Sequence, residues 1–64
     1  MENKCVYIIY VTSIVNPDFI RTVAVYDVTY EDILKITKEY NDKNTVRDLK
    51  YYHEAWLVKK KVND

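Results

Sequence analysis

Two segments of the chain are dense in β-branched and aromatic residues, and a polar turn separates them. Residues 5–15 and 19–28 carry Val, Ile, Thr or Tyr at most positions, a composition that fits a pleated strand. Between them, Pro17 presets φ for the first central position of a turn, while Asn16 and Asp18 can bond to the nearby backbone. The pattern predicts an antiparallel β-hairpin.

The expected pairing of these strands gives the two faces of the hairpin different characters. If Val15 lies opposite Phe19, one face is aliphatic and we expect it to form the core: Val11 pairs with Val23, and Ile9 with Val25. The opposite face is then mixed polar and aromatic, pairing Thr12 with Thr22, Tyr10 with Ala24, and Ile8 with Tyr26. Such a face is suited to being half-solvated or covered by a partner.

A helix is predicted directly after the hairpin. Thr29 can cap its start, with Asp32 three residues later, a spacing typical of helix N-termini. Apolar and small residues then recur at helical spacing, namely Ile33, Ile36, Thr37 and Tyr40. The polar segment 41–44 should end the helix, and an Asn there can adopt the left-handed C-cap that glycine normally supplies.

Residues 45–58 permit two interpretations. A helix would present one apolar stripe, made of Val46, Leu49, His53, Trp56 and Leu57. A strand over residues 49–58 would place Tyr52, Trp56 and Val58 on one face, and Leu49, Tyr51, His53, Ala55 and Leu57 on the other. We favour the strand, because Tyr-Tyr-His and Trp-Leu-Val are poor helix formers and a two-stranded ribbon is marginal without a third strand.

The chain is therefore predicted to be a single α+β domain over residues 1–64, with its ordered core at about residues 5–60. The element order β-β-α-β gives a three-stranded antiparallel or mixed sheet, with strand order 2-1-3 and one helix on one face. The alternative order is β-β-α-α. A chain of about 60 residues buries a small core, so self-association is an expected source of further stability.

Composition excludes several kinds of site. The 64 residues contain no glycine, which excludes a Gly-rich phosphate loop, because such a backbone must approach its ligand closely. Cys5 is the single cysteine, so no internal disulfide is possible, and with no Cys/His cluster we predict no metal and no cofactor. Ten basic and ten acidic residues cancel, which gives no overall attraction to nucleic acid or to anionic lipid.

The sequence has neither the pattern of a signal peptide nor that of a membrane span. The apolar stretch that follows Lys4 is interrupted by Thr12, Ser13 and Asn16. No apolar run reaches the roughly 18 residues needed to cross a bilayer. We therefore expect a cytoplasmic protein with no membrane partner.

Four segments carry a resemblance to known proteins. They are residues 6–11 (Val-Tyr-Ile-Ile-Tyr-Val), 23–33, 38–40 (Lys-Glu-Tyr) and 51–58 (Tyr-Tyr-His-Glu-Ala-Trp-Leu-Val). Together they resemble a broad group of small uncharacterised proteins of phages and mobile elements in low-GC Gram-positive bacteria. In that group a hairpin leads into a helix, which is followed by a strand that opens with paired tyrosines. The resemblance implies the β-β-α-β layout and a phage-type role, and its motifs include no catalytic signature.

Candidate catalytic groups are few. A nucleophile–base pair would need His53 close to Cys5, Ser13 or a threonine and oriented by a carboxylate, and nothing in the spacing indicates this. Glu31 and Asp32 are neighbours at the predicted helix start, where acidic residues are expected because of the helix dipole. We therefore predict that the protein is not an enzyme.

The aromatic residues carry the strongest functional signal. On the mixed sheet face we expect a partner-binding set of Tyr10, Tyr26, Tyr52, Trp56, Thr12 and Thr22. Exposed Tyr and Trp supply much of the energy at protein interfaces, although the same rings could instead cover a thin core. We predict a protein that binds and inhibits a host or defence protein through this face, and that forms a homodimer. The alternative is a single-stranded nucleic-acid-binding protein, in which the rings stack on bases and Lys59–Lys61 contact phosphates. Zero net charge and two arginines make nucleic acid the less favoured partner.

Overall fold

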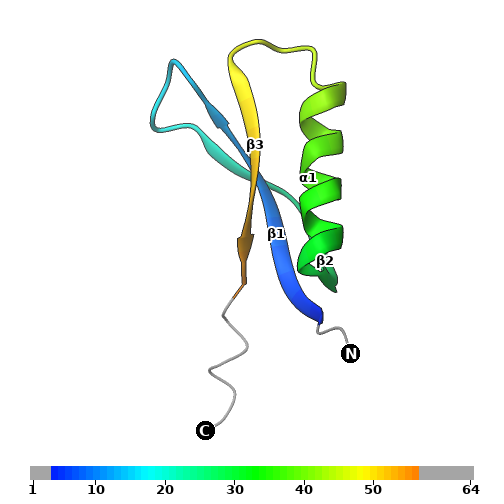
Figure 1. Ribbon diagram of the computed structural model, residues 1–64. Helices are drawn as coiled ribbons and strands as arrows, with labels where there is room; N and C mark the ends of the chain where they lie inside the picture. Colours follow the sequence, from blue (N-terminus) through cyan, green and yellow to red (C-terminus); the bar gives the residue numbers. More distant parts are fainter. Residues whose placement is uncertain (1–3, 57–64) are drawn as a thin grey trace, which may run out of the picture.

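A computed structural model describes residues 4–56 as a three-stranded antiparallel sheet with one helix packed on one face (Figure 1). The elements are β1 (Lys4–Ser13), β2 (Ile20–Thr29), α1 (Tyr30–Lys43) and β3 (Leu49–Ala55). The central strand β1 pairs antiparallel with both neighbours, in the order β2-β1-β3. The predicted β-β-α-β layout and the strand order 2-1-3 are confirmed. The alternative second helix is wrong, because β3 forms in its place.

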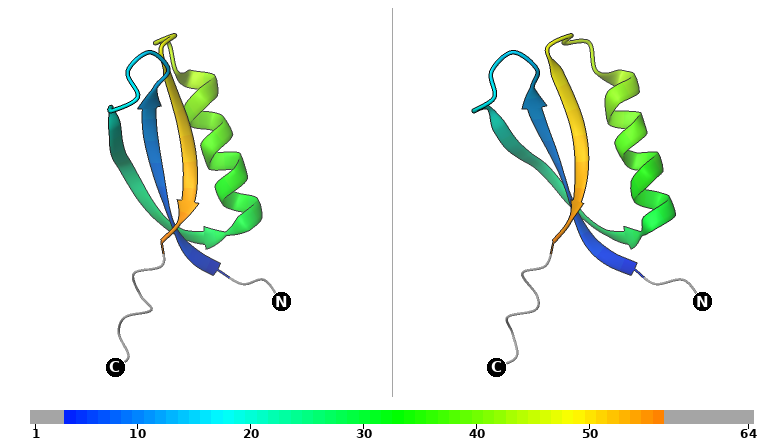
Figure 2. Two further views of the ribbon diagram at one scale, coloured as in Figure 1. Left: turned by 90° about the vertical axis from the view of Figure 1, so that its left-hand side faces the viewer. Right: turned by 60° about the vertical axis from the view of Figure 1, so that its left-hand side comes forward.

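The helix covers one side of the sheet and leaves the other side uncovered. In the left panel of Figure 2 the three strands lie in front, and α1 runs behind β3. Both ends of the described chain lie at the end of the molecule where α1 begins (Figure 1). Residues 4–56 thus form two layers, the sheet and the helix, and no helix or strand of this range covers the other face of the sheet.

The hairpin turn forms as the sequence predicts. The N–H of Phe19 donates to the Asn16 carbonyl at 3.0 Å, which closes a β-turn with Pro17 at its first central position. The N–H of Asp18 donates to the side-chain oxygen of Asn16 at 3.2 Å. Ser13 Oγ also accepts the Asn16 N–H, at 3.0 Å. Polar side chains therefore stabilise a turn that contains no glycine.

The pairing of β1 with β2 differs from the expected register in two ways. Val15 and Phe19 lie in the loop between the strands, and Thr12 pairs with Ile20 where Thr22 was expected. Farther from the turn, β2 also contains a bulge. Ile9 pairs with Ala24, whereas the next residue, Tyr10, pairs with Thr22. Val23 therefore has no partner in β1. One extra residue in a strand changes which face the side chains beyond it occupy, so the faces of β2 are exchanged over the half of the strand that leads to α1.

This exchange corrects three of the predictions. Val23 and Val25 do not belong to the core, since they are 42% and 50% exposed. Tyr26, expected on the mixed face, lies instead on the helix side of the sheet and packs against the core. Ile9 and Val11 are buried as predicted, because the face that β1 turns to the helix was assigned correctly.

The core lies between β1 and α1. Ile9 of the sheet and Ile33 of the helix are completely buried, and Tyr7 is nearly so. Half-buried side chains surround these three, namely Cys5, Tyr26, Val28, Ile36, Tyr40 and Tyr51. The helical residues of this set follow the spacing seen in the sequence, so the predicted apolar stripe of the helix is confirmed.

The helix begins as predicted but ends differently. Thr29 is the N-cap, with its Oγ1 accepting the N–H of Asp32 at 3.2 Å. At the other end Asn44 is extended, with φ −70° and ψ 127°, and no residue of 4–56 has a positive φ. The predicted left-handed Asn cap is therefore wrong. The Asn44 side chain stabilises the loop instead, since Nδ2 donates to the Leu49 carbonyl at 2.9 Å.

Asn41 attaches the last turn of α1 to the outer edge of β3. Its amide oxygen accepts the N–H of Tyr51 at 2.9 Å, and its amide nitrogen donates to the Tyr51 carbonyl at 3.0 Å. The same nitrogen also donates to the Thr37 carbonyl at 3.3 Å. A side-chain amide thus takes the place that the peptide group of a further strand would occupy, and it fixes the helix against the sheet.

Candidate interaction surface

The sheet face turned away from α1, called the open face below, is built from alternate residues of the strands. In β1 the side chains of Val6, Ile8, Tyr10 and Thr12 alternate with those buried under the helix. The residues of β2 and β3 that pair with these four complete the open face. All three strands therefore contribute to one surface.

Stacked tyrosines occupy the middle of the open face. Tyr10 pairs with Thr22 on one side and with Tyr52 on the other. The ring centroids of Tyr10 and Tyr52 are 5.6 Å apart, with an interplanar angle of 27°. Stacked rings at this separation attract one another beyond the area they bury. The pair therefore presents a fixed aromatic surface at the centre of the sheet.

Aliphatic and indole side chains extend this surface toward the start of β1. Ile8 pairs with the exposed Val25. Trp56 follows β3, and its backbone N–H donates to the Val6 carbonyl at 2.8 Å. Tyr52 and Trp56 are each 41% exposed. Contiguous exposed apolar surface of this kind marks an interaction site in a folded protein.

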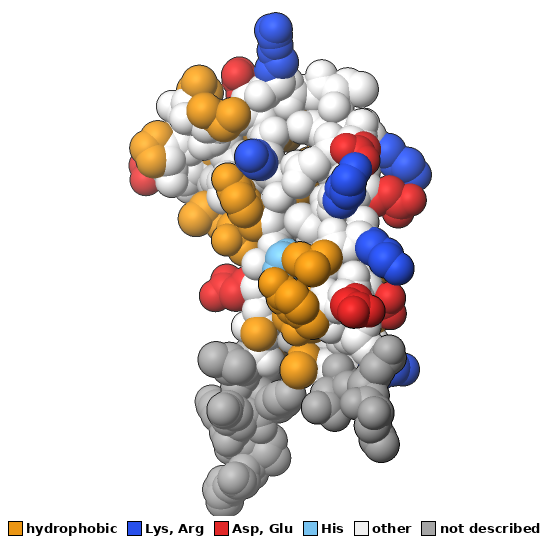
Figure 3. Space-filling model, in the orientation of Figure 1, with side chains coloured by type: hydrophobic (Ala, Val, Ile, Leu, Met, Phe, Trp, Pro, Cys, Tyr) orange, Lys and Arg blue, Asp and Glu red, His pale blue; other side chains and the backbone are white. Residues whose placement is uncertain are grey.

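The apolar surface of the molecule is distributed unevenly. In Figure 3, which has the orientation of Figure 1, apolar side chains gather at the upper left, over the hairpin, and in the lower middle beside the histidine. Charged side chains cover α1 on the right, where Lys38 and Asp42 form an exposed ion pair at 2.8 Å. The outer side of α1 thus has the composition of a solvent-facing helix, whereas the sheet side does not.

Charged residues of opposite sign lie at the two ends of the open face. Lys50 of β3 pairs with Thr12, next to the hairpin turn. Glu54 of β3 and Asp27 of β2 lie at the other end, where β1 begins. Lys4, in phase with Val6 and Ile8, also lies at that end. The open face therefore carries Lys50 at one end, two acidic residues and Lys4 at the other, and apolar side chains between them.

Five of the six residues predicted to bind a partner lie together on the open face, namely Tyr10, Tyr52, Trp56, Thr12 and Thr22. Tyr26 does not, because the bulge turns it to the helix side. The predicted strand residues Leu57 and Val58, and the run Lys59–Lys61, lie outside the described residues.

Val25, Lys50 and Glu54 also belong to the open face, although the sequence pattern did not single them out. Val25 was placed on the opposite face by a register without the bulge. Lys50 and Glu54 alternate with Tyr52 along β3, so period-two reading of this strand would have identified both. The alternation along β3 was therefore sufficient to place Lys50 and Glu54 on the open face, whereas no pattern in the sequence placed Val25 there.

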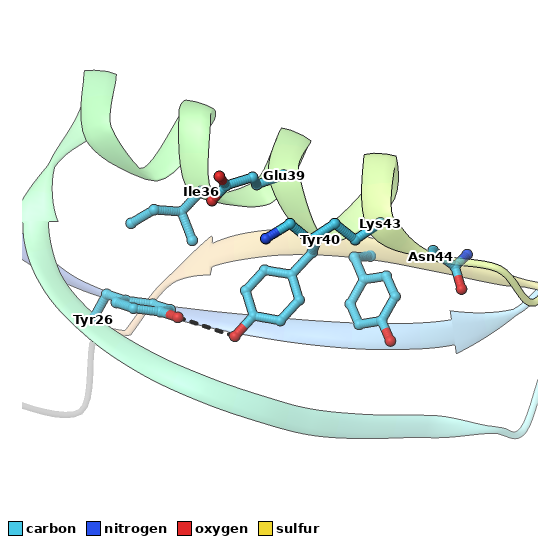
Figure 4. A pocket seen from close by; sticks show the side chains of 7 residues that line it. Tyr26, Ile36, Glu39, Tyr40, Lys43 and Asn44 are labelled. Atoms are coloured by element: carbon cyan, nitrogen blue, oxygen red, sulfur yellow. Dashed lines mark hydrogen bonds between the residues drawn. The ribbon is translucent and has the colours of Figure 1, made fainter.

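A groove of about 520 Å³ lies on the helix side of the sheet, between α1 and β2 (Figure 4). Tyr26 of β2 and Tyr40 of α1 meet there, with their hydroxyl oxygens 3.0 Å apart. The Tyr40 ring also stacks on Tyr51 of β3, with centroids 5.3 Å apart. Glu39 and Lys43 line the groove from the helix. The Tyr26–Tyr40 contact crosses from β2 to α1 at this groove.

The hydrogen bond with Tyr26, together with burial, raises the pKa of Tyr40 to about 12. A phenol with such a pKa stays protonated at neutral pH, so Tyr40 is a neutral hydrogen-bonding group and is no general base. The tyrosine pair therefore acts as a structural link between β2 and α1.

His53 lies under the helix, in contact with a hydroxyl group. Its Nδ1 is 3.2 Å from Thr37 Oγ1, and this hydroxyl donates to the Ile33 carbonyl at 2.7 Å. Because the hydroxyl proton is committed to that carbonyl, the imidazole Nδ1–H is the donor to Thr37. The rings of Tyr7 and Tyr30 enclose His53 edge-on at 6.0 and 6.1 Å. The contact between His53 and Thr37 thus packs the helix on the sheet, and His53 does not accept the proton of the Thr37 hydroxyl as a general base would.

Two further observations concern the described part of the chain. Among residues 4–56, no three His, Cys, Asp or Glu side chains come together in a way that could hold a metal ion. The helix within this range is too short and too polar to cross a membrane.

In comparisons with known proteins, no family model, no curated protein and no solved structure matches the chain with significance.

Proposed function

We propose that the protein is a small phage-type interaction factor that binds a host or defence protein in the cytoplasm through its open face. It acts by occupying a surface of that partner, and no chemical step is involved. The observation that carries this proposal is the uncovered, ring-rich open face, with Tyr10, Tyr52 and Trp56 on one side of a single sheet layer.

The energetics of the open face support binding. Covering exposed apolar surface is worth roughly 25 cal/mol per Å², and Tyr and Trp dominate the residues whose loss weakens protein interfaces most. The Tyr10–Tyr52 stack holds its rings in place before binding. A partner that covers them therefore loses less of its binding energy to side-chain ordering.

The class of partner follows from the resemblance of the chain to small proteins of phages and mobile elements. Such proteins act inside a bacterial host, so a host or defence protein is the proposed partner. The apolar centre and the charged ends of the open face have the layout of a protein interface, with a dry core and a polar rim.

The proposal is tested by comparing variants in affinity capture from the lysate of a low-GC Gram-positive host. The double variant Tyr52→Ala/Trp56→Ala removes two open-face rings, and Leu34→Ala is the control. Leu34 is 42% exposed on α1, so the control removes an equally exposed apolar side chain from elsewhere.

A partner captured by the wild type and by Leu34→Ala should bind the double variant at least about tenfold more weakly, since hot-spot truncations exceed roughly 1.4 kcal/mol. Circular dichroism establishes that each variant is folded. If folded double variant and wild type hold every captured protein with equal affinity, the open face is not the binding site.

Single-stranded nucleic acid is the second candidate partner, and one observation favours it. The exposed Tyr10–Tyr52 stack could extend onto a base, as in sheet-based readers of single strands. Only Lys4 and Lys50 are basic on the open face of residues 4–56, and Asp27 and Glu54 oppose them. Titration of an oligonucleotide at several salt concentrations distinguishes the two, because phosphate contacts give a steep loss of affinity with salt.

A further inference from the structure

We propose that the open face also pairs with itself, so that two copies of the protein form a symmetric face-to-face dimer in which Lys50 of each copy meets Glu54 of the other. This inference rests on the proposed function, since both treat the open face as a protein-docking surface. It goes further by naming one occupant of that face and the register in which it docks.

The strand pairing arranges the open face in three rows across the sheet, each with one residue from β2, β1 and β3. The rows are Ile20, Thr12 and Lys50; then Thr22, Tyr10 and Tyr52; then Val25, Ile8 and Glu54. The two outer rows are therefore alike on β2, where both residues are aliphatic. They are opposite in charge on β3.

A two-fold axis that crosses the strands above the middle row exchanges the two outer rows. Lys50 of one copy then lies over Glu54 of the second copy, and the reverse pair forms at the other end. On β2, Ile20 of each copy meets Val25 of the other, while Tyr52 packs near its own symmetry mate. On β1, Thr12 of each copy packs against Ile8 of the other. The outer-row residues of β2 and β3 thus each meet a group of matching chemistry in a two-fold interface.

The other in-plane axis, parallel to the strands, gives a poor match. It would place Lys50 over the aliphatic end of β2 at Ile20, and Glu54 over Val25. Both charges would lose water without gaining a partner, which is strongly unfavourable. The charge pattern therefore selects the axis that crosses the strands.

The same axis also provides a contact for apolar residues at both ends of the sheet. Trp56 lies one row beyond Glu54, at the end where β1 begins. The exchange carries it over the hairpin end of the second copy, where Ile14 and Val15 are exposed. The backbone N–H of Ile14 donates to the Asp48 carbonyl at 2.7 Å. This bond continues the pairing of β1 with β3 and fixes the backbone of Ile14 in place.

The size of the open face sets the expected strength of the dimer. Three strands about 4.8 Å apart, with about seven paired positions each at about 3.3 Å, give a face of roughly 14 by 23 Å. This is about 320 Å² per copy, well below the roughly 800 Å² per partner of a standard interface and in the range of weak, transient contacts. We therefore expect a dimer in the micromolar range that dissociates readily, which leaves the open face available to a foreign partner.

Sedimentation equilibrium of the full chain tests the register with two charge reversals. Lys50→Glu and Glu54→Lys each place like charges opposite one another in both pairs, so each variant alone should dimerise at least about tenfold more weakly than the wild type. An equimolar mixture of the two variants restores two attractive pairs, and it should form a heterodimer near wild-type affinity. Lys38→Glu, a charge reversal on exposed α1, should leave dimerisation unchanged.

A wild type that stays monomeric up to high micromolar concentration would overturn the inference. So would a dimer whose affinity neither charge reversal lowers, or two variants that fail to recover affinity when mixed. The proposed function fails separately. If the wild type is monomeric but Tyr52→Ala/Trp56→Ala loses the partner, the dimer is refuted and the proposed function is supported. If the dimer forms in this register but the double variant binds the partner as the wild type does, the proposed function is refuted and the dimer is supported.

Discussion

Substitution of Asn41 by alanine tests how the helix is attached to the sheet. The variant loses both hydrogen bonds between the Asn41 amide and the backbone of Tyr51, at 2.9 and 3.0 Å, and the weaker bond to Thr37 at 3.3 Å. Each bond contributes about 1 kcal/mol net, so the loss of the two bonds to β3 amounts to about 2 kcal/mol. Alanine is the better helix former by roughly 0.5 kcal/mol. The free energy of unfolding should therefore fall by about 1.5 kcal/mol.

This fall is large for a protein of this length. At roughly 0.05–0.15 kcal/mol per residue, a chain of 64 residues is stabilised by about 3–10 kcal/mol. Urea denaturation followed by circular dichroism measures the change. With a slope of about 1 kcal/mol per molar urea for so small a domain, the midpoint should move by about 1.5 M at unchanged slope.

Asp42→Ala is the matched control for this measurement. Asp42 is the next residue in the same helical turn, and its exposed pair with Lys38 contributes at most about 0.5 kcal/mol. If Asn41→Ala destabilises the protein no more than Asp42→Ala does, the amide does not act as a strand substitute, and the reasoning is refuted.

Two further predictions concern the register and the tyrosine pair. Ile9→Ala should lower the free energy of unfolding by about 2–5 kcal/mol, because Ile9 is completely buried, whereas Val25→Ala should lower it by less than about 1 kcal/mol; equal losses in urea denaturation would contradict the bulged register. The pKa of Tyr40 is raised from 10.0 to about 12 in the folded protein, so its contribution to stability is complete below about pH 10 and is lost as the pH rises through about 12. The melting temperature should fall across this window, and it should fall less steeply in Tyr26→Phe, which lacks the largest cause of the shift; equal slopes would show that the pair does not raise the pKa.

Most of the fold follows from local signals in the sequence. The turn at Asn16 and Pro17 and the helix start at Thr29 are each determined by residues within three positions of one another. The burial of Ile33 follows from helical periodicity, and the strand at residues 49–55 follows from the poor helix propensity of Tyr-Tyr-His. Such features are predictable because the physical cause and its effect lie in the same short segment.

The register of β2 could not be predicted in this way. Val23 and Val25 alternate with Ala24 and Tyr26, and either pair could face a core on hydrophobicity alone. The observed register places the hydroxyl of Tyr26 in contact with that of Tyr40, which lies fourteen residues later in α1. A bulge that allows such a long-range contact leaves no mark in the strand itself, least of all in a chain where no glycine signals it.

The bulge also determines what the open face can bind. Without it, the register that pairs Tyr10 with Thr22 would continue with Ala24 opposite Ile8 and Tyr26 opposite Val6, so the large polar-tipped ring would stand on the open face. With it, Val25 stands opposite Ile8, and the outer rows carry aliphatic groups of similar size on β2. The side chain that the bulge withdraws is the one that links β2 to α1 through Tyr40. The same irregularity therefore stabilises the monomer on one side of the sheet and makes the other side complementary to its own copy.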